Sequence, residues 1–488
     1  MTKKGLFRTL ALLALTAALT AALCPPALAA SYTDVPSNHW AAPQIDRCAA
    51  LGILRGETDT AFGLKKPMTR AAFAVALCRF FGWEADASAA TPYTDVPAGK
   101  WYTGAVAAAY AKGALTTQRP TFRPNDPITR EEMAVMLIRA LGYGTIAGLA
   151  QDLQSPFTDV TTNDGYITMA HDLGLVTGTT ASTFSPGATA TREQAAVLLI
   201  RLYDKLHAAP PAAIGIAGSA GGDLTGFDAI AVDTGRLALA GKKAVYSTAL
   251  GNKETSAIRE GARAAGAKTL LYVSGRENLV QKADPAQVAG VISQAVEKGD
   301  YEGLFLDIPG VSAQNRSRFT ALAAAVDAAL GNKDFYLAAD APSLSTTGGA
   351  GYDHAALAAL ADRLVVRPAS PQEKTGDFPV TPVEPLEEAY YALDSLRDIP
   401  NLTFLVTSGD SSGSYTGLEA EALAEEGAYY SERYGCAYLQ RGRDTVWYLD
   451  GRACRERVQL LGFFAVDQLC LTDVSGAAPA QLAGLGIR

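Results

Sequence analysis

The sequence is poor in the residues that build metal centres and disulfide frameworks. It holds only 4 histidines and 6 cysteines in 488 residues, with no C-x-x-C pair. An odd number of cysteines, at irregular spacing, follows the N-terminal segment. These absences argue against a zinc site and a disulfide framework, and they leave open only a bond between Cys48 and Cys78. We predict no metal and no cofactor.

Long apolar runs are also absent, except at the N-terminus. Lys3, Lys4 and Arg8 precede an apolar run over residues 10–23, and Ala27-Leu28-Ala29 is a small-x-small cleavage site. This layout is typical of a secretory signal peptide, predicted over residues 1–29. Cys24 leaves a lipoprotein anchor open, although the large Leu23 before it disfavours one. No later stretch reaches the roughly 20 apolar residues that span a bilayer, so we expect export without membrane insertion.

Positive charge is scarce once that segment is set aside. Removing its three basic residues from the 42 lysines and arginines leaves 39, against 50 aspartates and glutamates, a net charge of −11. This balance argues against nucleic acid and against anionic membrane surfaces as partners.

What the chain does have is one pattern repeated three times, predicted over residues 31–88, 91–150 and 155–207. Each copy carries an aromatic-x-Asp-Val motif, a helix that ends at a glycine, a phenylalanine and a Thr-Arg pair eight residues beyond it. The arginines fall 60 and 62 residues apart. The matched positions are Asp34, Asp95 and Asp159; Gly52, Gly113 and Gly174; Phe62, Phe122 and Phe184; and Arg70, Arg130 and Arg192.

The Thr-Arg pair marks the start of a second helix in each repeat. Thr129 with Glu132 has the form of a capping box, and Thr191 with Gln194 is its glutamine version. Ala72 in the first repeat removes half of that cap. We therefore interpret these threonines and their acidic or amide partners as structural.

The pattern closely resembles the S-layer homology (SLH) domain in three tandem copies. The resemblance implies an α-rich, three-pronged pseudo-trimer that binds secondary cell-wall polysaccharide, often pyruvylated, in grooves between the prongs. It implies the ligand role for the three arginines, Arg70, Arg130 and Arg192. A guanidinium pairs bidentately with a carboxylate, and the N–H groups of a first helical turn would favour the same anion.

Other positions that recur among the three repeats leave two interpretations open. Asp34, Asp95 and Asp159 are either ligand contacts or turn formers. Trp40 and Trp101 either stack on sugar rings or pack in the core, and we take Tyr166 as the third-repeat counterpart of these tryptophans. The number of working grooves is left open.

The segment 208–213, rich in alanine and proline, is predicted to link the repeats to a second domain over residues 214–488. Short β-rich runs there alternate with helical stretches, which indicates a (β/α)₈ TIM-like barrel, with a doubly wound α/β sheet as the alternative. The predicted strands lie at 229–233, 244–247, 269–273, 303–308, 335–339, 363–367, 402–407 and 468–471. Charged residues at strand ends predict a polar barrel mouth, formed by Asp233, Asp307, Asp340, Arg367 and Asp473.

The run 301–309 resembles the fourth-strand motif of glycoside hydrolase family 18, the chitinase-like barrels. In that family the last acidic position of the motif is the proton donor, and Pro309 stands there in this chain. Proline cannot donate a proton to a glycosidic oxygen. The resemblance thus implies a barrel that binds glycan without hydrolysing it. The alternative is a hydrolase that uses a different acidic pair, Asp307 and Asp340.

Overall fold

The computed structural model describes residues 32–149, 155–375, 378–424, 427–441 and 444–487. The chain divides into two compact units, Met1–Asp204 and Lys205–Arg488. The predicted signal peptide, with Cys24, lies outside the described residues. Cys48 and Cys78 are both buried and free, as are the three cysteines of the second unit. Within the described ranges, no helix combines the length and apolar character needed to cross a bilayer.

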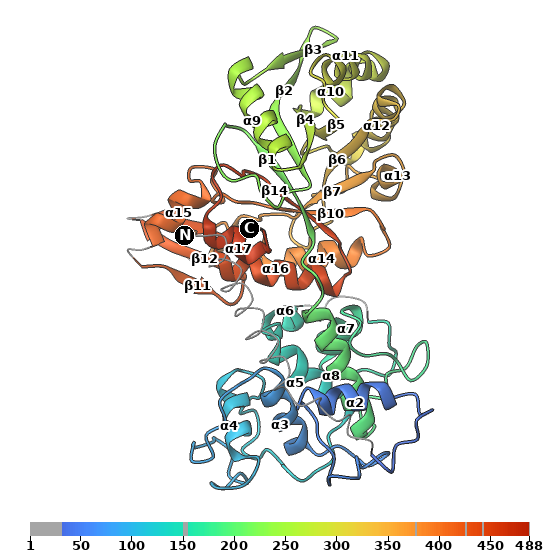
Figure 1. Ribbon diagram of the computed structural model, residues 1–488, viewed down its shortest axis with the longest axis vertical. Coiled ribbons are helices and arrows are strands. Elements are labelled where there is room, and N and C mark those ends of the chain that lie inside the picture. Colours follow the sequence, from blue (N-terminus) through green and yellow to red (C-terminus); the bar gives the residue numbers. More distant parts are fainter. Residues whose placement is uncertain (1–31, 150–154, 376–377, 425–426, 442–443, 488) are drawn as a thin grey trace, which may run out of the picture. The chain divides into compact units, whose positions relative to one another are not determined.

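Each repeat of the first unit contributes a pair of helices, and a short extra helix follows the second pair (Figure 1). The pairs are α2 (Ala42–Ala50) with α3 (Arg70–Phe80), α4 (Thr103–Ala111) with α5 (Arg130–Ala140), and α7 (Asp164–Asp172) with α8 (Arg192–Leu206); the extra helix is α6 (Gly144–Leu149).

The segments that precede α3, α5 and α8 join the three repeats into a closed ring. The N–H of Ile128 donates to the carbonyl of Met68 at 2.8 Å, that of Ala190 to Ile128 at 2.9 Å, and that of Met68 to Ala190 at 2.9 Å. Each bond runs from one repeat to another, and the third returns to the first. This arrangement gives the predicted pseudo-trimer its approximate threefold symmetry.

The helix caps follow the sequence prediction with one exception. Thr129 and Glu132 form a complete capping box at α5, and Thr69 accepts a hydrogen bond from the N–H of Ala72 at 3.2 Å. In the third repeat Gln194 accepts from the N–H of Thr191 at 3.1 Å. However, the buried hydroxyl of Thr191 has no hydrogen-bond partner within the described residues.

This difference predicts unequal effects of the same substitution. Valine keeps the shape of threonine and removes only the hydroxyl. Thr129→Val is expected to lower the free energy of unfolding of the repeats by about 1 kcal/mol, because a helix N-cap is lost. Thr191→Val removes a hydroxyl that caps nothing, so it is expected to be neutral to within about 0.5 kcal/mol. Denaturant unfolding of the two variants measures the difference, and equal losses would contradict it.

The second unit contains a closed barrel of eight parallel strands, which confirms the predicted fold class. The strands follow in the order β1, β2, β4, β5, β6, β7, β10 and β14, and β1 pairs with both β14 and β2. That last pairing closes the sheet and excludes the doubly wound alternative. The bounds are β1 (Ala212–Ala217), β2 (Ala229–Ala240), β4 (Lys268–Ser274), β5 (Gly303–Asp307), β6 (Asp334–Asp340), β7 (Arg363–Arg367), β10 (Leu402–Val406) and β14 (Gln468–Leu471).

Two of the predicted elements are corrected by this topology. The barrel begins with β1, so the last two residues of the predicted linker, Ala212 and Ala213, belong to a strand. The strand predicted over 244–247 is β3 (Lys243–Thr248), which pairs antiparallel with β2 as a hairpin and stays outside the barrel. Its burial alternates where that of β1 is almost continuous, as expected for a strand at the sheet edge.

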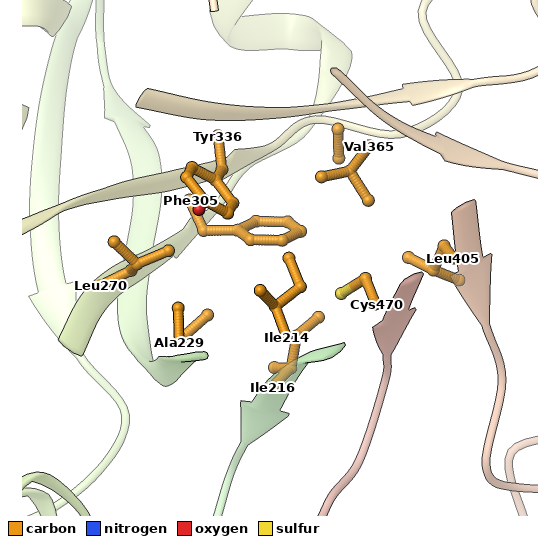
Figure 2. Close-up of a cluster of buried hydrophobic side chains, with 11 residues drawn as sticks. Ile214, Ile216, Ala229, Leu270, Phe305, Tyr336, Val365, Leu405 and Cys470 are labelled. Atoms are coloured by element: carbon orange, nitrogen blue, oxygen red, sulfur yellow. The ribbon is translucent and has the colours of Figure 1, made fainter. Parts of the chain in front are cut away.

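Apolar side chains fill the inside of the barrel. Figure 2 shows Ile214, Phe305 and Cys470 pointing towards one another from β1, β5 and β14, and all three are at most 1% exposed. The interior is therefore a packed core.

Helices flank the barrel strands, and a small three-stranded antiparallel sheet is inserted between β10 and β14 (Figure 1). The helices are α9 (Asn252–Ala264), α10 (Glu277–Lys282), α11 (Pro285–Lys298), α12 (Arg316–Leu330), α13 (His354–Ala358), α14 (Leu386–Ser395), α15 (Gly417–Ala424), α16 (Gly451–Phe463) and α17 (Pro479–Leu485), with a 3₁₀ turn at Ala313–Asn315. The inserted sheet consists of β11 (Tyr429–Ser431), β12 (Cys436–Arg441) and β13 (Asp444–Tyr448), and a further hairpin of β8 (Glu373–Thr375) and β9 (Phe378–Val380) follows β7.

Candidate functional site

The three arginines that begin α3, α5 and α8 each reach into another repeat. Nε of Arg70 donates to the carbonyl of Phe122 at 2.7 Å, and the guanidinium lies 4.9 Å from the centre of that ring. Arg130 makes the same pair of contacts with Phe184, at 2.9 and 4.4 Å. Arg192 completes the set with Phe62 of the first repeat, at 2.8 and 5.0 Å. The same contact is therefore built three times around the ring.

These contacts hold each guanidinium in place; Arg130 is half-buried, and Arg192 is buried, with only 7% of its surface exposed. Arg130 and Arg192 each donate a second hydrogen bond through Nη2, to the carbonyls of Thr177 and Arg55 respectively. Within the described residues Nη1 of both arginines makes no hydrogen bond. Burial lowers the pKa of Arg130 and of Arg192 from the usual arginine value, which still leaves them cationic at neutral pH.

The first N–H group of each of these helices, in contrast, is not open to an anion, so the sequence-based rationale is wrong for that donor. The N–H of Arg70 donates to the carbonyl of Asp126 at 3.0 Å, and that of Ala71 to the carbonyl of Pro124 at 3.0 Å. In the same way, the N–H groups of Arg130 and Arg192 donate to the carbonyls of Ala188 and Lys66. Carbonyls of another repeat accept these hydrogen bonds, so the first N–H group of each helix is already used.

A groove of about 480 Å³ surrounds Arg70, and it is lined by residues of all three repeats. Four arginines face two glutamates in its lining, which leaves an excess of positive charge. Its net charge is positive, but Glu132 within it already pairs with Arg70 and Arg123. Its charged lining residues are Arg70, Arg119, Arg123, Arg139, Glu131 and Glu132.

The aspartates have a structural role here, because each accepts hydrogen bonds from a backbone segment that is distant in sequence. Oδ1 and Oδ2 of Asp95 accept hydrogen bonds from the N–H groups of Phe122 and Arg123, at 2.7 and 2.6 Å. Asp34 and Asp159 hold the corresponding backbone segments of the first and third repeats. Their carboxylates are occupied in positioning the phenylalanine on which an arginine rests.

The pKa values of two of these aspartates reflect the same bonds. Burial alone would raise the pKa of Asp34, but the N–H groups of Leu64, Phe62 and Gly63 outweigh it and lower the pKa. The N–H of Phe184 is the main cause of the lowered pKa of Asp159.

The tryptophans lie at the surface rather than in the core. Trp40 is 60% exposed and Trp101 is 67% exposed. Tyr166 is not their counterpart, because it is buried within α7 and donates to the carbonyl of Gly144 at 3.1 Å. Both tryptophans stand two residues before their helix, and Thr162 holds that position in the third repeat. The third repeat therefore has no aromatic side chain at this surface position.

At the barrel mouth, three of the predicted residues form one ion-paired cluster. Nη2 of Arg367 lies 2.7 Å from Asp307, and its Nη1 lies 2.6 Å from Asp340. The hydroxyl of Tyr272 donates to Asp307 at 2.7 Å, and the N–H of Gly310 donates to Asp340 at 2.8 Å. Burial would lower the pKa of Arg367, but the two carboxylates outweigh it and raise the pKa. Both acids thus share one guanidinium as their counter-ion.

The other two predicted mouth residues lie outside this cluster. Asp233 pairs with Arg236 on its own strand, and Asp473 accepts from the N–H of Gly476 at 3.1 Å within its loop. The sequence had placed all five residues in one ring, but the structure brings together only Asp307, Asp340 and Arg367.

Sequence reasoning missed one acidic residue near the strand ends. Glu384 is 1% exposed and accepts hydrogen bonds from the hydroxyl and N–H of Thr407, just beyond β10. Burial raises its pKa to about 7. It comes from the loop before α14, and no periodicity or motif marks it. Its enclosure keeps it away from a substrate in this conformation.

Residues 31–74, 92–134 and 156–196 match the family model of the S-layer homology domain. These spans contain the three ring-forming arginines together with the aspartates that support them. The three N-terminal repeats are SLH domains. They place the protein at the bacterial cell surface, as a secreted protein anchored to the wall.

Relatives of this chain resemble it over part of its length. The chain is 32% identical over 179 residues to an amylopullulanase of Thermoanaerobacterium thermosulfurigenes, a match that covers 36% of this chain and 10% of the relative. It is 31% identical over 196 residues to an S-layer protein of Bacillus thuringiensis subsp. finitimus, covering 38% and 23%. The chain thus spans a small part of these relatives, which include both hydrolases and structural surface proteins.

Solved structures similar to the second unit include chitinases. A class V chitinase from Pseudomonas fluorescens Pf-5 aligns with a TM-score of 0.49 and 17% identity, covering 57% of this chain and 98% of that one. A family 18 chitinase from Cycas revoluta aligns with a TM-score of 0.49 and 13% identity, covering 56% and 98%.

Proposed function

We propose that the SLH domains hold the protein on an acidic secondary cell-wall polysaccharide, and that pyruvate ketals supply the carboxylates they recognise. The contact repeated by Arg70, Arg130 and Arg192 is the observation that supports this most strongly. A guanidinium fixed through Nε and a ring face is pre-organised, so little entropy is lost when it pairs with a carboxylate.

The exposed tryptophans complete the proposed binding surface. Trp40 and Trp101 present large apolar faces to solvent, which suits stacking on sugar rings. Since these faces do not depend on charge, we propose that they bind the neutral part of the polymer.

The test compares two forms of the same polymer. Full-length protein is expected to bind purified wall polysaccharide, and chemical removal of the pyruvate ketals is expected to weaken that binding at least tenfold. Loss of one bidentate ion pair, worth roughly 1.5–3 kcal/mol, accounts for that factor. Binding that is unchanged on the depyruvylated polymer, measured by titration calorimetry, would refute the carboxylate as the recognised group.

For the barrel we propose a glycan-binding role without hydrolysis. In the resemblance to family 18, Pro309 stands at the position of the proton donor, and Arg367 pairs with the two aspartates nearby. A glycosidase needs one carboxylic acid that is protonated and one carboxylate that is free. A paired cluster of this kind meets neither condition.

The competing function is glycan hydrolysis by Asp307 and Asp340, since both lie at strand ends where barrel enzymes place catalytic groups. Incubation of the protein with chitin oligosaccharides and wall glycan separates the two functions. Product release that is lost in Asp307→Asn would favour hydrolysis. Binding of an intact oligosaccharide without product favours the role proposed here.

A further inference from the structure

The three SLH arginines differ in the side chain that faces each guanidinium. Nη1 of Arg70 lies 2.7 Å from Oε1 of Glu132, the third residue of α5. The equivalent neighbour of Arg130 is Gln194, and that of Arg192 is Ala72. The hydrogen bonds of Arg130 and Arg192 within the described residues all go to backbone carbonyls. One arginine thus has a directly paired carboxylate, while the other two donate only to backbone carbonyls and interact with carboxylates over a longer range, Arg130 with Asp159 and Arg192 with Glu57.

Glu132 is held firmly beside Arg70. Its Oε2 accepts a hydrogen bond from the N–H of Thr129 at 3.0 Å, and its Oε1 also pairs with Arg123. Burial would raise the pKa of Glu132, but the Thr129 N–H and the arginines outweigh it and lower the pKa. The side chain is therefore a carboxylate at neutral pH.

A ligand carboxylate that approaches Arg70 meets this negative charge. It either displaces Glu132 from the guanidinium or binds beside it, and two unit charges about 4 Å apart near a protein surface repel by several kcal/mol. Part of this cost is offset by Arg123. Within the described residues, neither Arg130 nor Arg192 is hydrogen-bonded to a carboxylate that a ligand would have to displace.

We propose that Glu132 is an internal counter-ion that keeps Arg70 from wall carboxylates, so that Arg130 and Arg192 carry most of the anion binding. This inference rests on the proposed function, binding of an acidic polysaccharide by the SLH domains. It makes the grooves unequal and names the residue that determines the inequality.

Two reciprocal substitutions test the role of this residue. Glu132→Gln frees Arg70, and it keeps the cap because Gln194 already accepts from Thr191 in the equivalent position. It is expected to raise the affinity for purified acidic wall polysaccharide about three- to tenfold. Gln194→Glu gives Arg130 a counter-ion and is expected to lower the affinity by a similar factor. Both are measured by titration calorimetry on the full chain.

Glu84→Gln, in an exposed loop after α3, is the charge-matched control and is expected to change the affinity less than twofold. If Glu132→Gln leaves the affinity unchanged or weakens it, the counter-ion role is wrong. A failure of the proposed function itself looks different, because Arg130→Ala with Arg192→Ala would then bind as tightly as the native protein.

Discussion

Alanine at both Arg130 and Arg192 is expected to lower the affinity for acidic wall polysaccharide about 100-fold or more. Each replacement removes a bidentate partner of a carboxylate, worth roughly 1.5–3 kcal/mol. The two reductions in affinity multiply on a polymer that engages both arginines at once. Titration calorimetry, or retention of the protein on isolated walls, measures the effect.

Stability has to be followed in the same variants. Arg130 and Arg192 also donate to carbonyls of neighbouring repeats and lie over phenylalanine rings. Their loss is expected to cost about 1–2 kcal/mol per site in the free energy of unfolding, so binding must be measured well below the melting temperature. Arg47→Ala with Lys112→Ala removes the same charge at exposed positions, and it should leave wall binding within twofold of native. An equal loss in this control would mean that net charge, not the grooves, retains the protein.

Replacement of Arg367 by methionine is expected to destabilise the barrel by about 2–4 kcal/mol. The side chain of Asp307 is only 9% exposed, and the substitution leaves it and Asp340 without their shared counter-ion. Removing one partner of a buried pair costs more than the pair contributes, because the remaining charge stays desolvated. Denaturant unfolding of the full-length protein measures the loss in the transition of the second unit.

Two further variants sharpen this prediction. Asp307→Asn together with Asp340→Asn, added to Arg367→Met, should recover most of the lost stability because no unpaired charge remains. Arg236→Met breaks the more exposed pair with Asp233 and is expected to cost less than about 1 kcal/mol. Similar losses of stability in Arg236→Met and Arg367→Met would show that the cluster at the mouth contributes no more than an exposed ion pair.

The register of the repeats could be predicted from sequence because its signal is repeated. Three Thr-Arg pairs, each at a fixed distance from a phenylalanine, identify the helix starts and the arginines that begin them. The same spacing suggests that each arginine lies near its own phenylalanine, whereas it rests on that of another repeat. Closure of the ring is a long-range property that a local spacing does not contain.

Two of the sequence-based assignments were wrong for identifiable physical reasons. Strand β1 is short, alanine-rich and preceded by two prolines, so composition made it resemble a linker. Tyr166 was matched to the tryptophans by its aromatic type. Counting twelve residues back from Gly52, Gly113 and Gly174 reaches Trp40, Trp101 and Thr162 instead. Position relative to a helix end is a better guide than chemical similarity.

The pairing of acids at the barrel mouth was only partly predictable. The parallel order places the ends of β5, β6 and β7 side by side, so Asp307, Asp340 and Arg367 were expected to be neighbours. That a single guanidinium bridges both carboxylates depends on side-chain conformations, for which the sequence carries no signal.

Ring closure also determines how many of the proposed wall-binding sites the repeats can form. Every arginine lies on a phenylalanine contributed by a different repeat, so no single repeat owns a complete site. An open row of three such repeats would have two junctions, whereas the closed ring has three. Loss of any one repeat would therefore remove two of the three arginine–phenylalanine contacts and leave one.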